Sequence, residues 1–202
     1  MINGVNKMLI GSNNSLTYLR PSSWWSRVFK WFGECQSSTY IEQYEYCGVR
    51  LFDLRLYANE HCHIIVRNRN FRYSIFSLYE ILSYFNKKGD VTVRISFEAT
   101  LFDLINDSEY SRIEEKFVQI CKIIESIYPN INYFGGYRSY DNKVLYKFRH
   151  EAENGAPNII DITVNSWLYR KLPILSSIRN RYYIKKYEKE DGFLLLNFVD
   201  RR

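Results

Sequence analysis

The sequence lacks the features that mark membrane-spanning, disulfide-rich and metal-binding proteins. No apolar run approaches the 18 residues that a membrane span requires, and the N-terminus has no basic-then-apolar signal peptide. The four cysteines form no CxxC pair and have no regular spacing, so neither a disulfide framework nor a zinc site is indicated. Neighbouring His61, Cys62 and His63 would point to opposite faces of a strand and therefore do not indicate a metal site. We expect a cytoplasmic protein without metal or cofactor, unless it is cut or exported by another route.

Composition indicates a single globular domain with an anionic partner. A chain of 202 residues is long enough for one full core, and 46% apolar and 25% charged residues are ordinary for a globular protein. We therefore expect residues 1–202 to form one domain. The aromatic fraction of 17%, with 18 tyrosines, predicts both core packing and polar pocket or interface surface. The net charge of +6 favours an anionic partner but identifies no particular ligand.

Segments with strand and helix patterns alternate along the chain. The clearest helix covers residues 110–128, where apolar residues recur at three- and four-residue intervals before Pro129. Other helices are expected at residues 24–32, 77–86 and 176–187. Strands are expected at residues 7–10, 49–56, 63–67, 91–97, 143–148, 159–164 and 193–199. This alternation predicts an α/β fold with a small TIM-barrel-like parallel barrel of about seven strands, incomplete if an eighth is missing.

One motif delivers an acid and an arginine from the same strand. Gly48-Val49-Arg50 forms a turn that runs into Leu-Phe-Asp-Leu-Arg at residues 51–55. Alternation along the strand puts Asp53 and Arg55 on one face. Such a pair suits a phosphate or polyol ligand, with the arginine as donor and the aspartate as the acceptor that orients it. A salt bridge inside a barrel is the alternative interpretation.

Six segments in a fixed order carry a resemblance to a known family. They are Gly-Ser-Asn-Asn-Ser at residues 11–15, Cys-Gln at 35–36, the motif at 48–55, and the segments at 64–69, 77–82 and 91–98. Their order and spacing, over about half the chain, resemble the bacterial phosphatidylinositol-specific phospholipase C group, whose catalytic X-domain is a barrel. The resemblance implies a TIM barrel and an anionic partner that carries phosphate, either a phosphorylated polyol or a phospholipid headgroup.

The resemblance fails at the residues that the family's chemistry needs. Two histidines act there as general base and general acid, and this sequence has Asn13 and Asn68 in their places. Asn14 replaces the aspartate after the first histidine, and Glu98 replaces a lysine. An asparagine amide can hydrogen-bond a phosphate or a hydroxyl, but it cannot exchange a proton near neutral pH. Because general acid–base catalysis contributes ~10²–10⁴-fold per group, we expect standard phosphodiester cleavage to be lost.

A ring of arginine and amide side chains is expected where the barrel strands end. The family's retained positions are matched by Asp53 and Arg55 and by Arg149, at the end of the strand expected at 143–148. The expected ligand-binding residues are Asn13, Asn14, Asp53, Arg55, Asn68, Arg69, Arg149 and Asn165. Such a ring suits binding a phosphate ester or a sugar more than abstracting a proton.

Two positions keep other possibilities open. Glu98 and His150 are the titratable groups of this ring that could act as acid or base near neutral pH, so they are the candidate catalytic residues of an altered enzyme.

The last strand most resembles the family's seventh, which would leave the eighth strand missing. If it is instead the eighth, the family's aspartate there has become Asn197.

A cluster of tryptophans and cations lies near the N-terminus. Residues 1–33 contain no acid, and the cluster consists of Trp24, Trp25, Arg27, Lys30 and Trp31. Tryptophans beside cations favour a bilayer interface, where cations meet anionic lipid. The resembled family also contacts membrane through a helix at this point. The alternative is that two or three of the aromatics of this region, which are Trp24, Trp25, Phe29 and Trp31, cap the barrel core.

Three classes of function remain open. The first is a degenerate phospholipase C-like protein that binds a phosphorylated polyol or lipid headgroup without turnover, as a pseudoenzyme with peripheral membrane contact. The second is a phosphoric diester hydrolase, or an enzyme on phosphorylated glycans, with altered catalytic residues. The third is a nucleic-acid binder, which ranks last because the sequence contains no recognisable nucleic-acid-binding module.

Overall fold

The computed structural model describes residues 8–22, 24–29, 34–58, 64–68, 71–73, 78–98, 107–138, 141–163 and 173–201. Within these ranges the strands are β1 (Met8–Ser12), β2 (Val49–Ala58), β3 (Ile64–Asn68), β4 (Phe71–Tyr73), β5 (Thr92–Phe97), β6 (Asn132–Arg138), β7 (Ile159–Asp161) and β8 (Gly192–Leu196). The helices are α1 (Trp24–Val28), α3 (Tyr40–Glu45), α4 (Leu78–Lys88), α5 (Asp107–Ile127), α6 (Arg149–Asn154), α8 (Pro173–Tyr187) and a final 3₁₀ turn (Val199–Arg201).

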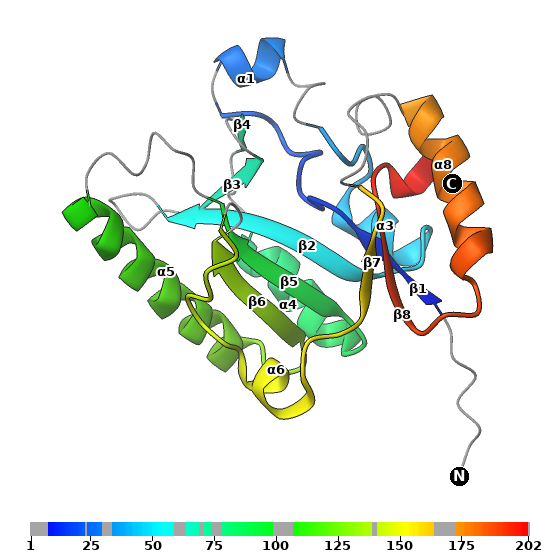
Figure 1. Ribbon diagram of the computed structural model, residues 1–202. Coiled ribbons are helices and arrows are strands. Elements are labelled where there is room, and N and C mark those ends of the chain that lie inside the picture. Colours follow the sequence, from blue (N-terminus) through cyan, green and yellow to red (C-terminus); the bar gives the residue numbers. More distant parts are fainter. Residues whose placement is uncertain are drawn as a thin grey trace.

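The strands form one curled sheet that resembles part of a barrel. Its parallel strands follow the order β7-β8-β1-β2-β5-β6. The sheet curls around β1 and β2 into a half-barrel, with β6 and β7 as its free edges (Figure 1). The strand expected at 63–67 exists as β3, but β3 runs antiparallel to the end of β2 and leads into β4. It therefore extends β2 as a hairpin and is not one of the parallel barrel strands.

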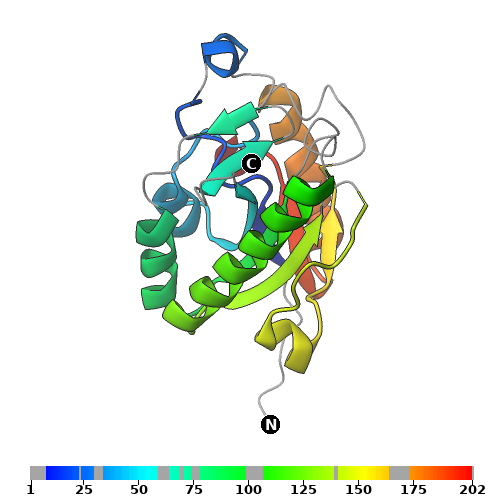
Figure 2. The ribbon, with the colours of Figure 1, turned by 90° about the vertical axis from the view of Figure 1, so that its left-hand side faces the viewer.

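Alternation along β2 and β5 divides the sheet into an apolar and a partly charged face. Phe52 of β2 packs on Phe85 of α4, with ring centroids 4.3 Å apart, and Phe97 of β5 packs on Phe117 of α5 at 4.9 Å. Figure 2 shows α5 lying across this face of the sheet. Burying one such aromatic side chain contributes roughly 1.5–3 kcal/mol to folding. These helices thereby fix the outer face, and the other face is left for the site.

The face turned away from α4 and α5 changes character along the strands. At the level of Leu51, near the start of β2, it holds a small apolar cluster of Leu51, Phe134 and Leu195. Two residues further along β2, on the same face, comes the buried carboxylate of Asp53. This face is therefore apolar at one end and charged at the carboxyl end of the strands, where the expected ring lies.

The prediction of a strand at residues 143–148 is wrong, and the strand that pairs with β5 is β6. Val144 makes only an isolated bridge to Tyr137, while the preceding Asn-Tyr-Phe-Gly-Gly-Tyr-Arg segment, which was not predicted, pairs with β5. Two adjacent glycines read as a turn in the sequence. Here they allow close approach instead: Gly135 has a φ of 105°, and a Cβ there would lie 2.5 Å from the Ile95 carbonyl oxygen. The helices α3 and α6 and the strand β4 were also missed.

The last strand lies beside the first. β8 pairs with β1 in parallel register from Met8↔Gly192 to Ser12↔Leu196. A missing strand after the last one was the preferred interpretation of the sequence, but the open side of the half-barrel lies between β6 and β7. The alternative, in which Asn197 follows the final strand of the barrel, agrees better with this order.

Candidate functional site

The centre of the site is the carboxylate of Asp53, which is fully buried. Its Oδ1 accepts a hydrogen bond from Arg94 Nε at 2.7 Å. Its Oδ2 accepts from Arg55 Nε at 3.2 Å and from the backbone N–H of Asn14 at 3.2 Å. The register aligns Asp53 with Arg94 across β2 and β5, and Arg55 lies two residues further along the same face. The expected contact between Asp53 and Arg55 is thus confirmed.

The charges of this cluster hold one another in the ionised state. Burial alone would raise the pKa of Asp53, but Arg94 and Arg55 and the hydrogen bonds to Asp53 hold it well below its usual range. Burial likewise opposes the charge on Arg55, yet Asp53, Glu98 and Cys35 nearby raise the pKa of this guanidinium. Asp53 therefore acts as a fixed anion between two fixed cations near neutral pH.

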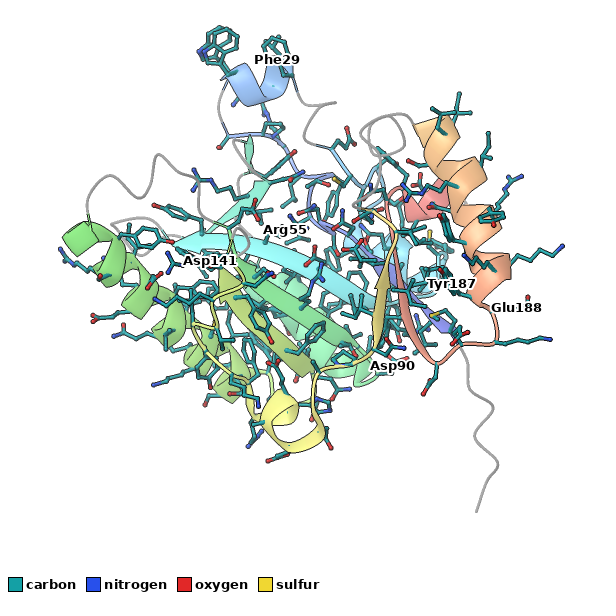
Figure 3. The ribbon with its side chains drawn as sticks, in the orientation of Figure 1. Phe29, Arg55, Asp90, Asp141, Tyr187 and Glu188 are labelled. Atoms are coloured by element: carbon teal, nitrogen blue, oxygen red, sulfur yellow. The ribbon has the colours of Figure 1, made fainter. Side chains whose placement is uncertain are left out.

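The remaining nitrogens of Arg55 lie beside Asn13 and Glu98, which follow β1 and β5. We call this carboxyl end of the strands the mouth of the half-barrel. Its Nη2 donates to Asn13 Oδ1 at 3.3 Å, and its Nη1 lies 3.6 Å from Glu98 Oε2. The second distance is longer than a hydrogen bond, so Nη1 makes none within the described part of the chain. Figure 3 labels Arg55 above β2, near the end of that strand. The Nε of this guanidinium therefore makes the salt bridge to Asp53, while its two Nη groups lie beside Asn13 and Glu98.

Asn13 joins the first and last strands at the site. Its Nδ2 donates to Asn197 Oδ1 at 2.7 Å, and its backbone N–H donates to the Leu196 carbonyl at 2.9 Å. Gln36 braces the same point, since its Nε2 donates to the carbonyls of Asn13 at 3.0 Å and Leu196 at 2.9 Å. In the sequence, Cys35-Gln36 is only part of a family pattern, and no residue pattern predicts this role of Gln36.

Two further asparagines meet at a cysteine. Asn14 Nδ2 lies 3.7 Å from Cys35 Sγ, and Asn68 Nδ2 lies 3.5 Å from the same sulfur, within the range of hydrogen bonds to sulfur. Asn14 has a φ of 47°, in the left-handed region that asparagine tolerates better than most residues. All three expected asparagines near Asp53 are therefore brought together, and Cys35 joins them.

Arg94 was missed by sequence analysis although its signal was present. On the strand predicted at 91–97 it alternates with Ser96 and then Glu98, so all three share a face. The sequence prediction names Glu98, a charged residue at the strand end, as a site residue and does not include Arg94. Within the described part of the chain the terminal nitrogens of Arg94 make no hydrogen bond.

Arg149 and His150 lie at the opposite end of the sheet, contrary to expectation. They open α6 and line a pocket of about 340 Å³ with Asn132, the first residue of β6. The level of Asn132 is six residue pairs from that of Glu98, roughly 20 Å at ~3.3 Å per strand residue. The cause is the misplaced strand at 143–148: because it does not form, its end does not reach the mouth. Arg149 is therefore no second donor at the site, and His150 is no partner for Glu98.

The exposed aromatic cluster projects away from the sheet. Trp24 is 61% and Trp25 58% exposed, and their rings stack with centroids 4.1 Å apart. Phe29 stacks on Trp25 at 5.6 Å and is labelled on α1 in Figure 3. Trp24 and Trp25 therefore do not cap the core.

Four expected residues cannot be placed in this geometry. Arg69, Asn165, Lys30 and Trp31 lie outside the described residues.

Comparisons with family models and with curated proteins identify no relative. No family model matches the chain, and neither does any curated protein. The likeness to phospholipase C therefore stays a prediction. Among the described residues, no helix has the length and apolar character needed to cross a bilayer. The same part of the chain contains no group of three or more histidine, cysteine or acidic side chains arranged to hold a metal ion.

Proposed function

We propose that the mouth of the half-barrel binds a phosphorylated polyol or a phospholipid headgroup and that standard phosphodiester cleavage is lost. The observation that carries this proposal is Asp53 clamped between Arg55 and Arg94, with Asn13, Asn14 and Asn68 beside it. The clamp fixes both guanidinium planes through their Nε atoms. It leaves nitrogen donors for a ligand.

The donors of the mouth suit the oxygens of a phosphate ester. Arg55 Nη1 lies 3.6 Å from Glu98 and can turn to a phosphate oxygen without losing a hydrogen bond to this residue. Arg94 has its terminal nitrogens free of hydrogen bonds to described residues. In this proposal Arg94 is the second donor beside Arg55, the role that the sequence had predicted for Arg149. Amide side chains complete the ligand shell, because an amide both donates to and accepts from sugar hydroxyls.

Loss of cleavage follows from the side chains around the clamp. Asn13 and Asn68 hold the positions where the resemblance demands proton-transferring histidines, and amides do not transfer protons near neutral pH. The alternative, an altered enzyme that uses Glu98 and His150 together, has the roughly 20 Å between their levels against it. An altered enzyme at this site would therefore have to use Glu98 beside Arg55, without His150.

A second proposal concerns the partner surface. We propose that α1 contacts anionic phospholipid through Trp24, Trp25 and Phe29, with Arg27 in the same helix. The stacked, solvent-exposed rings support it, because amphipathic aromatic rings are favoured at headgroup depth.

Titration calorimetry tests the binding proposal. Wild type is titrated with inositol phosphates, glycerophosphodiesters and inorganic phosphate, in parallel with Arg55→Lys and the matched control Arg149→Lys. Arg55→Lys keeps the charge but loses the planar fork, so affinity should fall roughly tenfold or more, whereas Arg149→Lys should bind as wild type. Equal affinities for wild type and Arg55→Lys would reduce Arg55 to a structural partner of Asp53.

A further inference from the structure

The backbone around Cys35 is held firmly at the carboxyl ends of the strands. The Cys35 N–H donates to Thr17 Oγ1 at 2.9 Å, and its carbonyl accepts from the Phe198 N–H at 2.8 Å. The side chain is 4% exposed, so its sulfur has a defined position inside the site. That position is set by two segments that are distant in the sequence, those of Thr17 and Phe198.

The surroundings of this sulfur are polar. Asn14 Nδ2 and Asn68 Nδ2 donate toward it from 3.7 and 3.5 Å, and Arg55 lies within electrostatic range. Amide donors and a nearby guanidinium stabilise negative charge on sulfur, which is the nucleophilic form of cysteine. The sulfur of Cys35 therefore has two amide donors and a guanidinium in its surroundings.

A second observation points to a ligand at the same place. Asn14 is 95% buried, and while its Nδ2 faces Cys35, its Oδ1 makes no hydrogen bond within the described residues. A buried amide oxygen without a donor costs roughly 1–3 kcal/mol, so a hydroxyl or an N–H of a ligand would be favoured beside it. Tyr73 has a buried hydroxyl that has no hydrogen-bond partner in the described part of the chain either, and Cys35 is among the groups near it.

The other described cysteines have different surroundings. Cys121 lies on α5 within the apolar core, where burial, and then Glu125, raises the pKa of its thiol well above the usual range. Cys47 is also buried in that core. The chain therefore contains its own control thiols.

We propose that Cys35 is a reactive thiol of the anion site, open to oxidation by hydroperoxides, so that a bound phosphate and the oxidant exclude each other. In the reaction the sulfur attacks one peroxide oxygen. An S–O bond forms as the O–O bond breaks, and the thiol proton leaves with the departing oxygen as water or an alcohol. The product is a sulfenic acid beside Arg55. This inference rests on the proposed function, because it places the phosphate at the same guanidinium.

The test measures oxidation of each cysteine in the full-length chain. Wild type is treated with hydrogen peroxide at pH 7, sulfenic acid is trapped with dimedone, and the tagged peptides are quantified by mass spectrometry. Cys35 should react at least tenfold faster than Cys121 and Cys47, and Asn68→Ala should slow Cys35 alone by several-fold. A Cys35 rate no higher than that of Cys121 would overturn the proposal.

A competition arm separates this inference from the proposed function. Saturating inositol phosphate, or inorganic phosphate, should slow the oxidation of Cys35 at least fivefold compared with chloride at equal ionic strength. Fast oxidation that neither anion slows would overturn the shared site. Calorimetry on the reduced wild type addresses the proposed function separately: phosphate binding without fast oxidation of Cys35 would overturn this inference and leave the proposed function standing, whereas fast oxidation without phosphate binding would overturn the proposed function.

Discussion

Arg94 and Asp53 face each other at one register position of β5 and β2, and Arg94 Nε donates to Asp53 Oδ1 at 2.7 Å. Arg55 approaches the other oxygen of the same carboxylate. A single buried anion therefore satisfies two guanidiniums, so the loss of Asp53 affects both of them at once.

Asp53→Ala should destabilise the fold by ~3–5 kcal/mol, because it leaves two largely buried guanidiniums without their acceptor. The matched control is Asp90→Ala, which removes the half-exposed partner of Arg50 at 2.9 Å and should cost about 1 kcal/mol or less. Urea unfolding of the three proteins measures both values. Similar losses in the two variants would mean that the Asp53 cluster is no stronger than a surface ion pair.

Stability should depend on pH through Asp53. Its pKa is lowered in the folded state, so its stabilising contribution is fully present above the unfolded-state value of about 3.9 and is lost as the pH falls through the folded-state value. Between pH 5 and pH 3, wild type should therefore lose more unfolding free energy than Asp53→Asn. Parallel pH profiles of the two proteins would exclude this contribution.

Gly135→Ala should destabilise the chain far more than Gly155→Ala. Both glycines have positive φ values, 105° and 78°, so both alanines are strained. A Cβ at Gly135 would also lie 2.5 Å from the Ile95 carbonyl oxygen, whereas nothing lies within 4 Å of one at Gly155. We expect an additional ~1–3 kcal/mol for Gly135→Ala from this overlap, measured by thermal unfolding.

The purified chain should show negligible cleavage of phosphatidylinositol. Asn13→His combined with Asn68→His should restore little, because Asn14 and Glu98 also differ from the family pattern. An assay with a chromogenic inositol phosphodiester measures both. Turnover by wild type within tenfold of an active bacterial phospholipase C would contradict the expectation.

Trp24→Ala with Trp25→Ala should weaken sedimentation with anionic vesicles and leave the free energy of unfolding nearly unchanged, since both rings are mostly exposed. Tyr46→Ala, which removes another exposed aromatic ring, serves as the control. Added salt should reduce binding, because exposed charges are screened beyond about 8–10 Å at physiological ionic strength. Equal, negligible binding to anionic and zwitterionic vesicles would remove the membrane proposal.

Sequence patterns predicted the elements whose residues are chosen by packing. The helix at 110–128 and the strands around Phe52 and Ile95 were placed within a few residues, because their apolar periodicity reflects burial against one another. β6 was not predicted, because two of its residues are chosen for close backbone contact and not for side-chain packing. Gly135 and Gly136 stand where the backbone of Ile95 and Tyr146 comes too close for any side chain, and glycine in a sequence reads as a turn.

The site was predictable where a side chain's face follows from its strand. Asp53 and Arg55 met as expected, because two residues apart on one strand means the same face. Arg149 and His150 were misplaced, since their position depended on a strand that does not form. Cys35 belongs to a loop, for which no periodicity indicates the direction of the sulfur.

The pairing of β1 with β8 has a consequence for how the protein is made. The hydrogen-bond partner of the Asn13 side chain, Asn197, is synthesised 184 positions later. Leu196, whose carbonyl accepts from Gln36, is synthesised 160 positions after Gln36. At translation rates of roughly 5–20 residues per second, about 10–40 s pass between the synthesis of these partners. During that interval Asn13 and Gln36 lack these native partners. We therefore expect nascent chains stalled before residue 192 to expose the β1 edge that β8 covers to chaperones and proteases, and the proposed binding site to form only once β8 has been made.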